Sequence, residues 1–111
     1  MYPAANRELA AKRTALAPKP EGAFRAFSEA VFADGALPAR TKQLIAVAAA
    51  HVTQCPYCIR GHTRAAIRAG ATREEIMEAI WVAAEMRAGA AYAHSSLALD
   101  TMDEIDKRSA A

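Results

Sequence analysis

Both cysteines of the chain and one of its three histidines lie within eight consecutive residues, in the run Cys-Pro-Tyr-Cys-Ile-Arg-Gly-His at positions 55–62. Proline suits the first position of a helix, because the N–H group that it lacks has no partner there, so Pro56 predicts a helix with Cys55 as its N-cap. Both sulfurs then lie near free backbone N–H groups and the positive end of the helix dipole, which favours thiolate over thiol. We therefore expect one thiol, that of Cys58 in our assignment, to have a pKa below the value of a free cysteine.

A histidine follows the second cysteine by four residues, so Cys58 and His62 share one face of the predicted helix. A histidine in this place can accept the proton of a thiol or stabilise a thiolate. The spacing C-x-x-C-x-x-x-H therefore predicts a dithiol that cycles between a reduced and a disulfide form, and it calls for no cofactor.

The same residues also fit other kinds of site. Cys55, Cys58 and His62 are good zinc ligands, with His51 as the nearest fourth ligand, but no second C-x-x-C or H-x-x-x-H pair is present, so we expect no metal. A structural disulfide would close a very small loop, and haem attachment requires histidine where Ile59 stands. Glutaredoxins also carry Cys-Pro-Tyr-Cys, but a β-strand precedes the motif there, whereas residues 42–51 have a helical pattern.

Composition indicates one small folded domain. The chain has 111 residues, of which 53% are hydrophobic, 23% charged and only 6% aromatic. An alanine-rich core of this size buries little area, which is one reason to expect a homo-oligomer. The net charge is +2 with dispersed basic residues, and no signal region or membrane-length apolar run occurs, so we expect a cytoplasmic protein that binds neither nucleic acid nor membrane. In a reducing cytoplasm a close cysteine pair is more often catalytic or metal-binding than structural.

The apolar spacing predicts an all-α bundle of about five or six helices. Helices are expected at residues 6–16, 21–32, 38–52 and 56–69, followed by a long helix that begins after Thr72, with Glu75 completing a capping box. A Phe24/Phe27 stripe and the small residues 89–91 suit contacts between helices or subunits, and the long helix has a candidate kink near Gly89. We divide the chain into an N-terminal helix and connector (1–20), a helical domain (21–102) and a charged, frayed tail (103–111).

The chain resembles the AhpD-like group of the carboxymuconolactone decarboxylase family. The resemblance rests on the helix at 38–52, the dithiol motif, the run A-G-A-T-R-E-E-I from residue 69 and the long alanine-rich helix. The similarity covers residues 21–99. It implies an all-helical trimer or hexamer with alkyl hydroperoxidase or protein disulfide reductase activity. The resemblance also implies that Cys58 attacks the hydroperoxide, that Cys55 then forms the disulfide, that His62 accepts a proton, and that a protein or small-thiol reductant reopens the bond.

One position departs from the family pattern. Gln43 stands where the relay glutamate of the family is expected, and a glutamine can orient His62 by a hydrogen bond but cannot take its proton. We therefore expect a weak peroxidase unless Glu85, a carboxylate in an apolar run, replaces that glutamate; an ion pair with Arg87 or another arginine explains Glu85 equally well. His51 is a further candidate for the relay. Zinc binding or protein interaction is the alternative function, and a lactone decarboxylase, suggested by the family name alone, ranks last.

Overall fold

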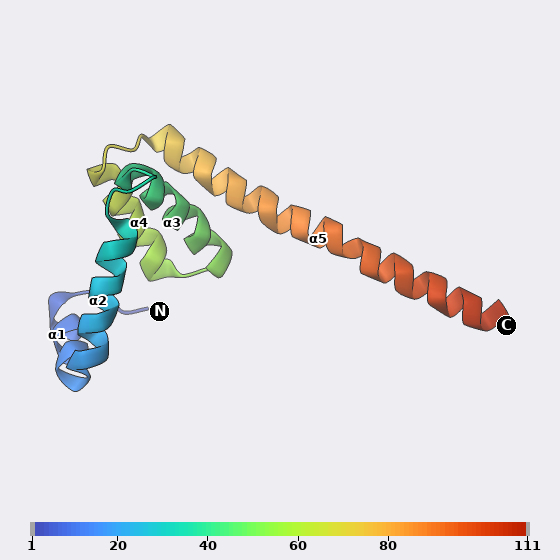
Figure 1. Cartoon of the computed structure of the whole chain (residues 1–111), viewed down its shortest axis with the longest axis horizontal. Helices are drawn as coiled ribbons and strands as arrows, with labels where there is room; N and C mark the ends of the chain where they lie inside the picture. The colour runs from blue at the N-terminus through green and yellow to red at the C-terminus, as the bar shows by residue number, and fades with distance from the viewer. Residues whose placement is uncertain (1, 111) are drawn as a thin grey trace.

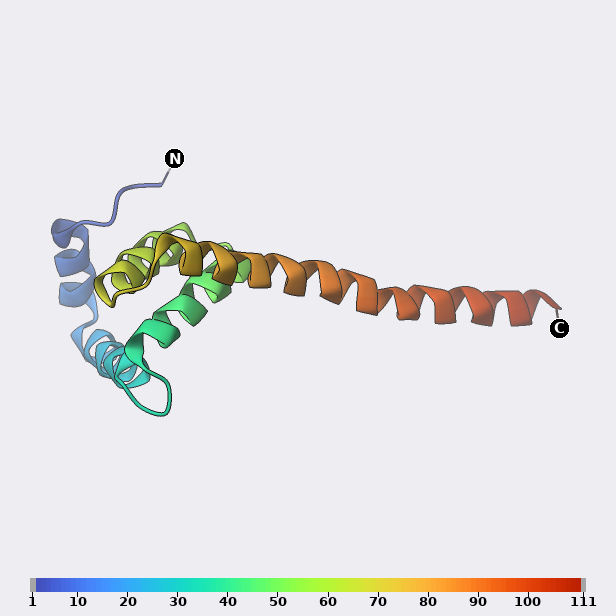
Figure 2. The same ribbon diagram turned by 90° about the horizontal axis from the view of Figure 1, so that it is seen from above.

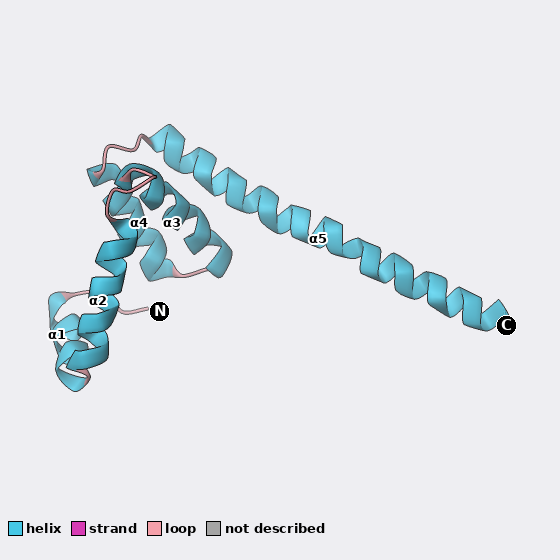
Figure 3. Ribbon diagram, viewed as in Figure 1, coloured by secondary structure: helices cyan, strands magenta, loops and turns pink. Residues whose placement is uncertain are grey.

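The computed structural model describes residues 2–110, which form five α-helices joined by short connections, with no strand in this range (Figures 1 and 3). In chain order the helices are α1 (Arg7–Leu16), α2 (Pro18–Phe32), α3 (Ala39–Thr53), α4 (Pro56–Arg68) and α5 (Arg73–Ala110). The all-α prediction is therefore confirmed. Over the same residues, no helix combines the length and hydropathy that a membrane span requires.

Helix α3 is the centre of the structure, because it packs against both α4 and the first half of α5. Small and β-branched side chains fill this junction and allow the three helices to approach closely. The buried hydrophobic residues are Val47, Ala50, Ala66, Ala71, Ile76 and Ala83. Helices α1 and α2 contact each other, and the backbone of α2 lies against α3, so the pair lies at the side of this core (Figures 1 and 2).

Helix α5 is a rod of 38 residues whose second half extends beyond the rest of the molecule (Figure 2). The capping box at its start is confirmed: the Glu75 N–H donates to Thr72 Oγ1 (3.1 Å), and the Thr72 N–H donates to Glu75 Oε1 (2.8 Å). The helix runs through Gly89 without a break and continues over residues 103–110, for which a frayed tail was expected; Ala111 lies outside the described residues. No proline follows Pro56, and strong helix formers dominate this stretch, so nothing in it stops the helix.

Two predicted helix starts were misplaced, both at prolines. Helix α2 begins at Pro18 and not after Pro20, because a proline in the first turn lacks only an N–H group that has no partner there. Pro38 is the N-cap of α3 and not its first residue, and the Ala39 N–H donates to the Asp34 carboxylate (2.6 Å). The connection after α4 passes through Gly70 at φ +97°, a conformation that favours glycine.

Candidate redox site

The dithiol lies at the beginning of α4, as the sequence predicts. Cys55 is the N-cap, and its Sγ accepts a hydrogen bond from the Cys58 backbone N–H at 3.2 Å. Both cysteines are free and half-buried. The two thiols therefore lie one helical turn apart at a helix N-terminus, close enough to interact.

The two thiols differ in acidity, and in the opposite order to our expectation. The Cys58 thiol donates to Cys55, and this bond, with the backbone N–H groups of Cys58 and Tyr57, lowers the pKa of Cys55, although burial opposes the effect. Donating that bond raises the pKa of Cys58, and burial and the charge of Cys55 add to the rise. The cause is local geometry: the N-cap sulfur collects the free N–H groups, and Cys58 becomes its donor.

His62 lies two turns into α4 and is oriented from α3. Its Nδ1 is 2.7 Å from Gln43 Oε1, and both side chains are half-buried. Because an amide oxygen can only accept, Nδ1 carries a hydrogen, and in the neutral ring Nε2 is then the acceptor. The expectation that Gln43 can orient His62 is thus met by a direct hydrogen bond.

A third helix also contacts His62. The ring of Phe32, the last residue of α2, stacks on the imidazole with 5.0 Å between centroids and 28° between planes. The sequence pattern does not reveal this contact, because a phenylalanine at the end of the α2 apolar stripe indicates only packing.

An open groove of about 520 Å³ joins these side chains. It is lined by Ser28, Glu29, Phe32, Gln43, Tyr57, Cys58, Gly61, His62 and Ala65. Of the two cysteines, Cys58 is the one that lines the groove, and His62 lines it too. A molecule in the groove would therefore have access to both Cys58 and His62, and Cys55 contacts Cys58 from outside the lining.

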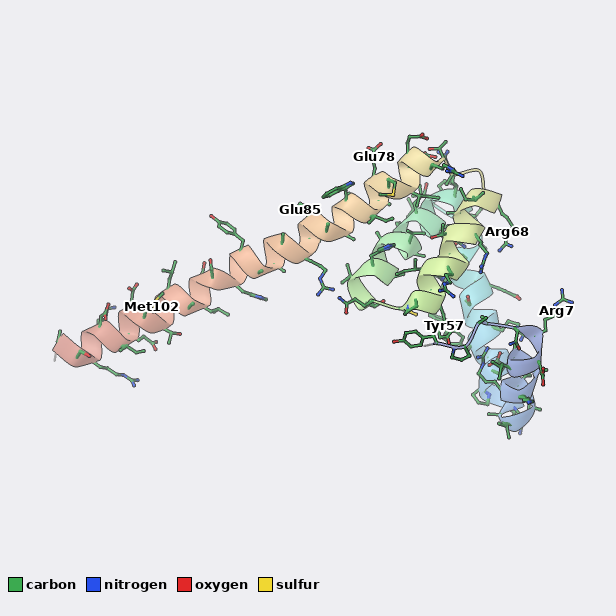
Figure 4. All side chains as sticks on the ribbon, turned by 180° about the vertical axis from the view of Figure 1, so that it is seen from behind. Arg7, Tyr57, Arg68, Glu78, Glu85 and Met102 are labelled. Carbon is green, nitrogen blue, oxygen red and sulfur yellow. The ribbon has the colours of Figure 1, made fainter. Side chains whose placement is uncertain are left out.

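The other two candidate relay residues lie elsewhere. His51 Nδ1 donates to Val47 O of its own helix (2.8 Å), and the ring lines a separate hollow with Gln54, Pro56, Ile59 and Arg60. Glu85 is exposed on α5, well apart from Tyr57 at the beginning of α4 (Figure 4). The alternative explanation of Glu85, an ion pair with Arg87 or another arginine, is also not seen among the described residues; Arg87 Nη1 donates to Val52 O (2.8 Å).

The zinc alternative gains no support from the geometry. Throughout residues 2–110, no three His, Cys, Asp or Glu side chains are grouped so that they could hold a metal ion. His62 directs one ring nitrogen to Gln43 and its ring face to Phe32.

Comparison with known proteins agrees with these features. The sequence matches the carboxymuconolactone decarboxylase family over residues 18–101. It is 72% identical over 86 residues, 78% of each chain, to "Uncharacterized protein 4 in cox locus" of Paracoccus denitrificans. Among solved structures, a carboxymuconolactone decarboxylase family protein of Legionella pneumophila is 35% identical with a TM-score of 0.70 over 87% of both chains. A Thermotoga maritima family member with a suggested involvement in antioxidative response is 30% identical, with a TM-score of 0.59 over 79% of this chain and 91% of its own. The chain therefore belongs to the carboxymuconolactone decarboxylase family.

Proposed function

We propose that the protein is a thiol-dependent peroxidase and disulfide reductase in which Cys55 and Cys58 form the redox pair. The observation that carries the proposal is the contact between the two cysteines at the start of α4, with Cys58 and His62 in one groove. The antioxidative involvement suggested for the Thermotoga maritima relative points to the same chemistry.

In the first step Cys58 attacks the terminal oxygen of a hydroperoxide. His62 takes the Cys58 proton at Nε2, the sulfur–oxygen bond forms, the oxygen–oxygen bond breaks, and the proton passes to the departing alkoxide, which leaves as an alcohol. Cys58 is then a sulfenic acid. The groove favours Cys58 for this step, because Cys58 lines it together with His62.

In the second step Cys55 closes the disulfide. Its lowered pKa favours a thiolate, which attacks the Cys58 sulfur and releases hydroxide; the hydroxide takes a proton from solvent and becomes water. A protein or small-thiol reductant then supplies two electrons and two protons to restore both thiols. A reducing compartment such as the cytoplasm would provide that reductant.

The test is to add one equivalent of hydroperoxide to the reduced protein and to measure intact mass and free thiols. We expect an intramolecular disulfide in the natural protein, a trappable sulfenic acid at Cys58 in Cys55→Ser, and no oxidation in Cys58→Ser. If Cys58→Ser reacts while Cys55→Ser is inert, the roles are reversed. If neither thiol of the natural protein reacts, peroxide reduction is excluded, and exchange with an oxidised dithiol substrate becomes the activity to measure.

The same protein samples distinguish zinc binding from a redox function. Metal content of the purified protein, measured beside free thiols, should show no stoichiometric zinc. One zinc per chain with both thiols protected from alkylation would favour the metal-binding alternative.

A further inference from the structure

The stacking of Phe32 on His62 joins the redox site to a helix that contributes none of the groups assigned above. Helix α2 has no buried residue of its own, yet its last side chain lies face to face with the imidazole. Phe24 and Phe27, which precede it on the same helix, are 68% and 63% exposed. Phe32 is thus the phenylalanine of α2 that turns inward, and it does so at the site.

A lysine of α3 binds the backbone at the end of α2, immediately before and after Phe32. The Lys42 ammonium donates to Val31 O at 2.8 Å and to Ala33 O at 2.6 Å, the carbonyls that flank Phe32. Such carbonyls have no partner inside the helix, and a cation at a helix C-terminus also complements the dipole. The attachment therefore fixes the backbone that carries Phe32.

Lys42 and Gln43 are consecutive residues, so one short stretch of α3 controls two contacts of the same histidine. Gln43 fixes the direction of Nδ1 by one hydrogen bond. A single bond leaves the imidazole free to rotate about that direction, whereas an aromatic face stacked on the ring restricts this rotation. Together the two contacts define the orientation of Nε2.

We propose that Phe32 is a positioning residue for His62 and that Lys42 holds Phe32 in place. The unit keeps the imidazole in the tautomer with Nδ1–H on Gln43 and Nε2 available to the groove. Its catalytic consequence rests on the proposed function: Gln43, the partner of His62 Nδ1, cannot take a proton, so its contribution to His62, like that of Phe32, is orientation.

The structural part of the inference is tested by the ¹⁵N signals of the His62 ring, assigned by their loss in His62→Ala. We expect the Nδ1–H tautomer in the reduced natural protein and in Phe32→Tyr, which keeps an aromatic face. Phe32→Leu should give a mixture of tautomers. Lys42→Met should also lower the population of the Nδ1–H tautomer, although the phenyl ring is still present. The matched control Phe27→Leu should give the natural spectrum. An unchanged tautomer in both Phe32→Leu and Lys42→Met overturns the proposal.

The catalytic part is tested with two peroxides of different size. Phe32 also lines the groove and could therefore act only by contacting the substrate. In that case Phe32→Leu would slow the reaction with a bulky hydroperoxide and leave the rate with hydrogen peroxide unchanged. A positioning residue instead lowers the rate of Cys58 oxidation for both by the same factor, about tenfold as part of a general-base contribution that is typically a hundredfold or more.

The histidine itself supplies the last control. In a His62→Ala background, Phe32→Leu should cause no further loss with hydrogen peroxide, because the two residues act through one group. A full additional loss there, or a loss confined to the bulky peroxide, overturns the proposal. If the natural protein does not reduce peroxide, the proposed function fails, and the tautomer measurement still decides whether Phe32 positions His62.

Discussion

Gln43 and His62 are joined by a 2.7 Å hydrogen bond between Oε1 and Nδ1, with an amide where a relay would use a carboxylate. Gln43→Glu places a proton acceptor at the same distance. We expect faster single-turnover reduction of peroxide, by about a hundredfold if the geometry is retained, and a new limb in the pH–rate profile that reports the added carboxylate.

Glu85→Gln is the matched control for this substitution, because Glu85 is exposed and outside the groove. It should leave the rate unchanged. Loss of activity in Glu85→Gln together with a slower Gln43→Glu enzyme would mean that Glu85 already serves the relay, since two carboxylates in one site raise the pKa of one of them. Changes below about twofold in both variants would exclude a relay through position 43 or Glu85 and favour disulfide exchange.

The order of the two thiol pKa values predicts which cysteine is alkylated first. The pKa of Cys55 is lowered by the Cys58 hydrogen bond, and that of Cys58 is raised. As pH rises from acid, Cys55 should become a thiolate first and react first with iodoacetamide, with a midpoint below that of a free cysteine. Peptide mass mapping after brief labelling measures this order. Preferential labelling of Cys58 across the titration would contradict it.

The capping box at α5 predicts a loss of stability in acid. Hydrogen bonding from the Thr72 backbone N–H lowers the pKa of Glu75, with the charge of Arg40 helping, and burial opposes it. The folded state therefore favours the carboxylate, so its contribution is present above the ordinary glutamate pKa and is lost as pH falls through the lowered value. Glu75→Gln should weaken the pH dependence of urea unfolding in this range, whereas Glu74→Gln should not.

Thr72 tests the same cap without a change of charge. Thr72→Ala removes the oxygen that accepts the Glu75 N–H, and it should lower the free energy of unfolding by about 1 kcal/mol near neutral pH. Thr72→Ser keeps an oxygen in that place and should retain most of the stability. Equal losses in both variants would show that the threonine methyl group, and not the cap, is responsible.

Exposed apolar side chains predict self-association. Trp81 is 70% exposed on α5, and Phe24 and Phe27 are similarly exposed on α2. We expect a trimer or hexamer by light scattering at micromolar concentration, with part of these surfaces between subunits. Trp81→Lys should reduce the mass. A monomeric mass for the natural protein would rule out this assembly.

The features predicted correctly from the sequence are those governed by neighbouring residues. Cys55 as N-cap and the Thr72–Glu75 capping box follow from side chains within one helical turn. The charged residues at the end of α5 include none that prevents a helix, and the helix continues through them to Ala110. The pKa order depends on which sulfur receives the N–H groups, and residue spacing alone does not determine that.

Contacts between distant parts of the chain were harder to predict from the sequence. Gln43 was placed near His62 through the family pattern, and its hydrogen bond spans 19 positions. No pattern pointed to Phe32 over His62, or to Lys42 at the end of α2, because each depends on how α2 is placed against α3 and α4. Apolar periodicity identifies the inward face of a helix but not the side chain that it meets.

The long unpacked half of α5 means that dilution should act on this protein as a denaturant does. A radius of gyration of 20.5 Å, against about 13 Å for a compact chain of this length, and a buried core made mainly of alanines leave one chain with little apolar burial of its own. Where subunit contacts supply the missing burial, folding follows mass action, and the unfolding midpoint rises with protein concentration. Activity lost in a dilute assay can then be recovered by adding an inactive Cys58→Ser protein as a source of subunits.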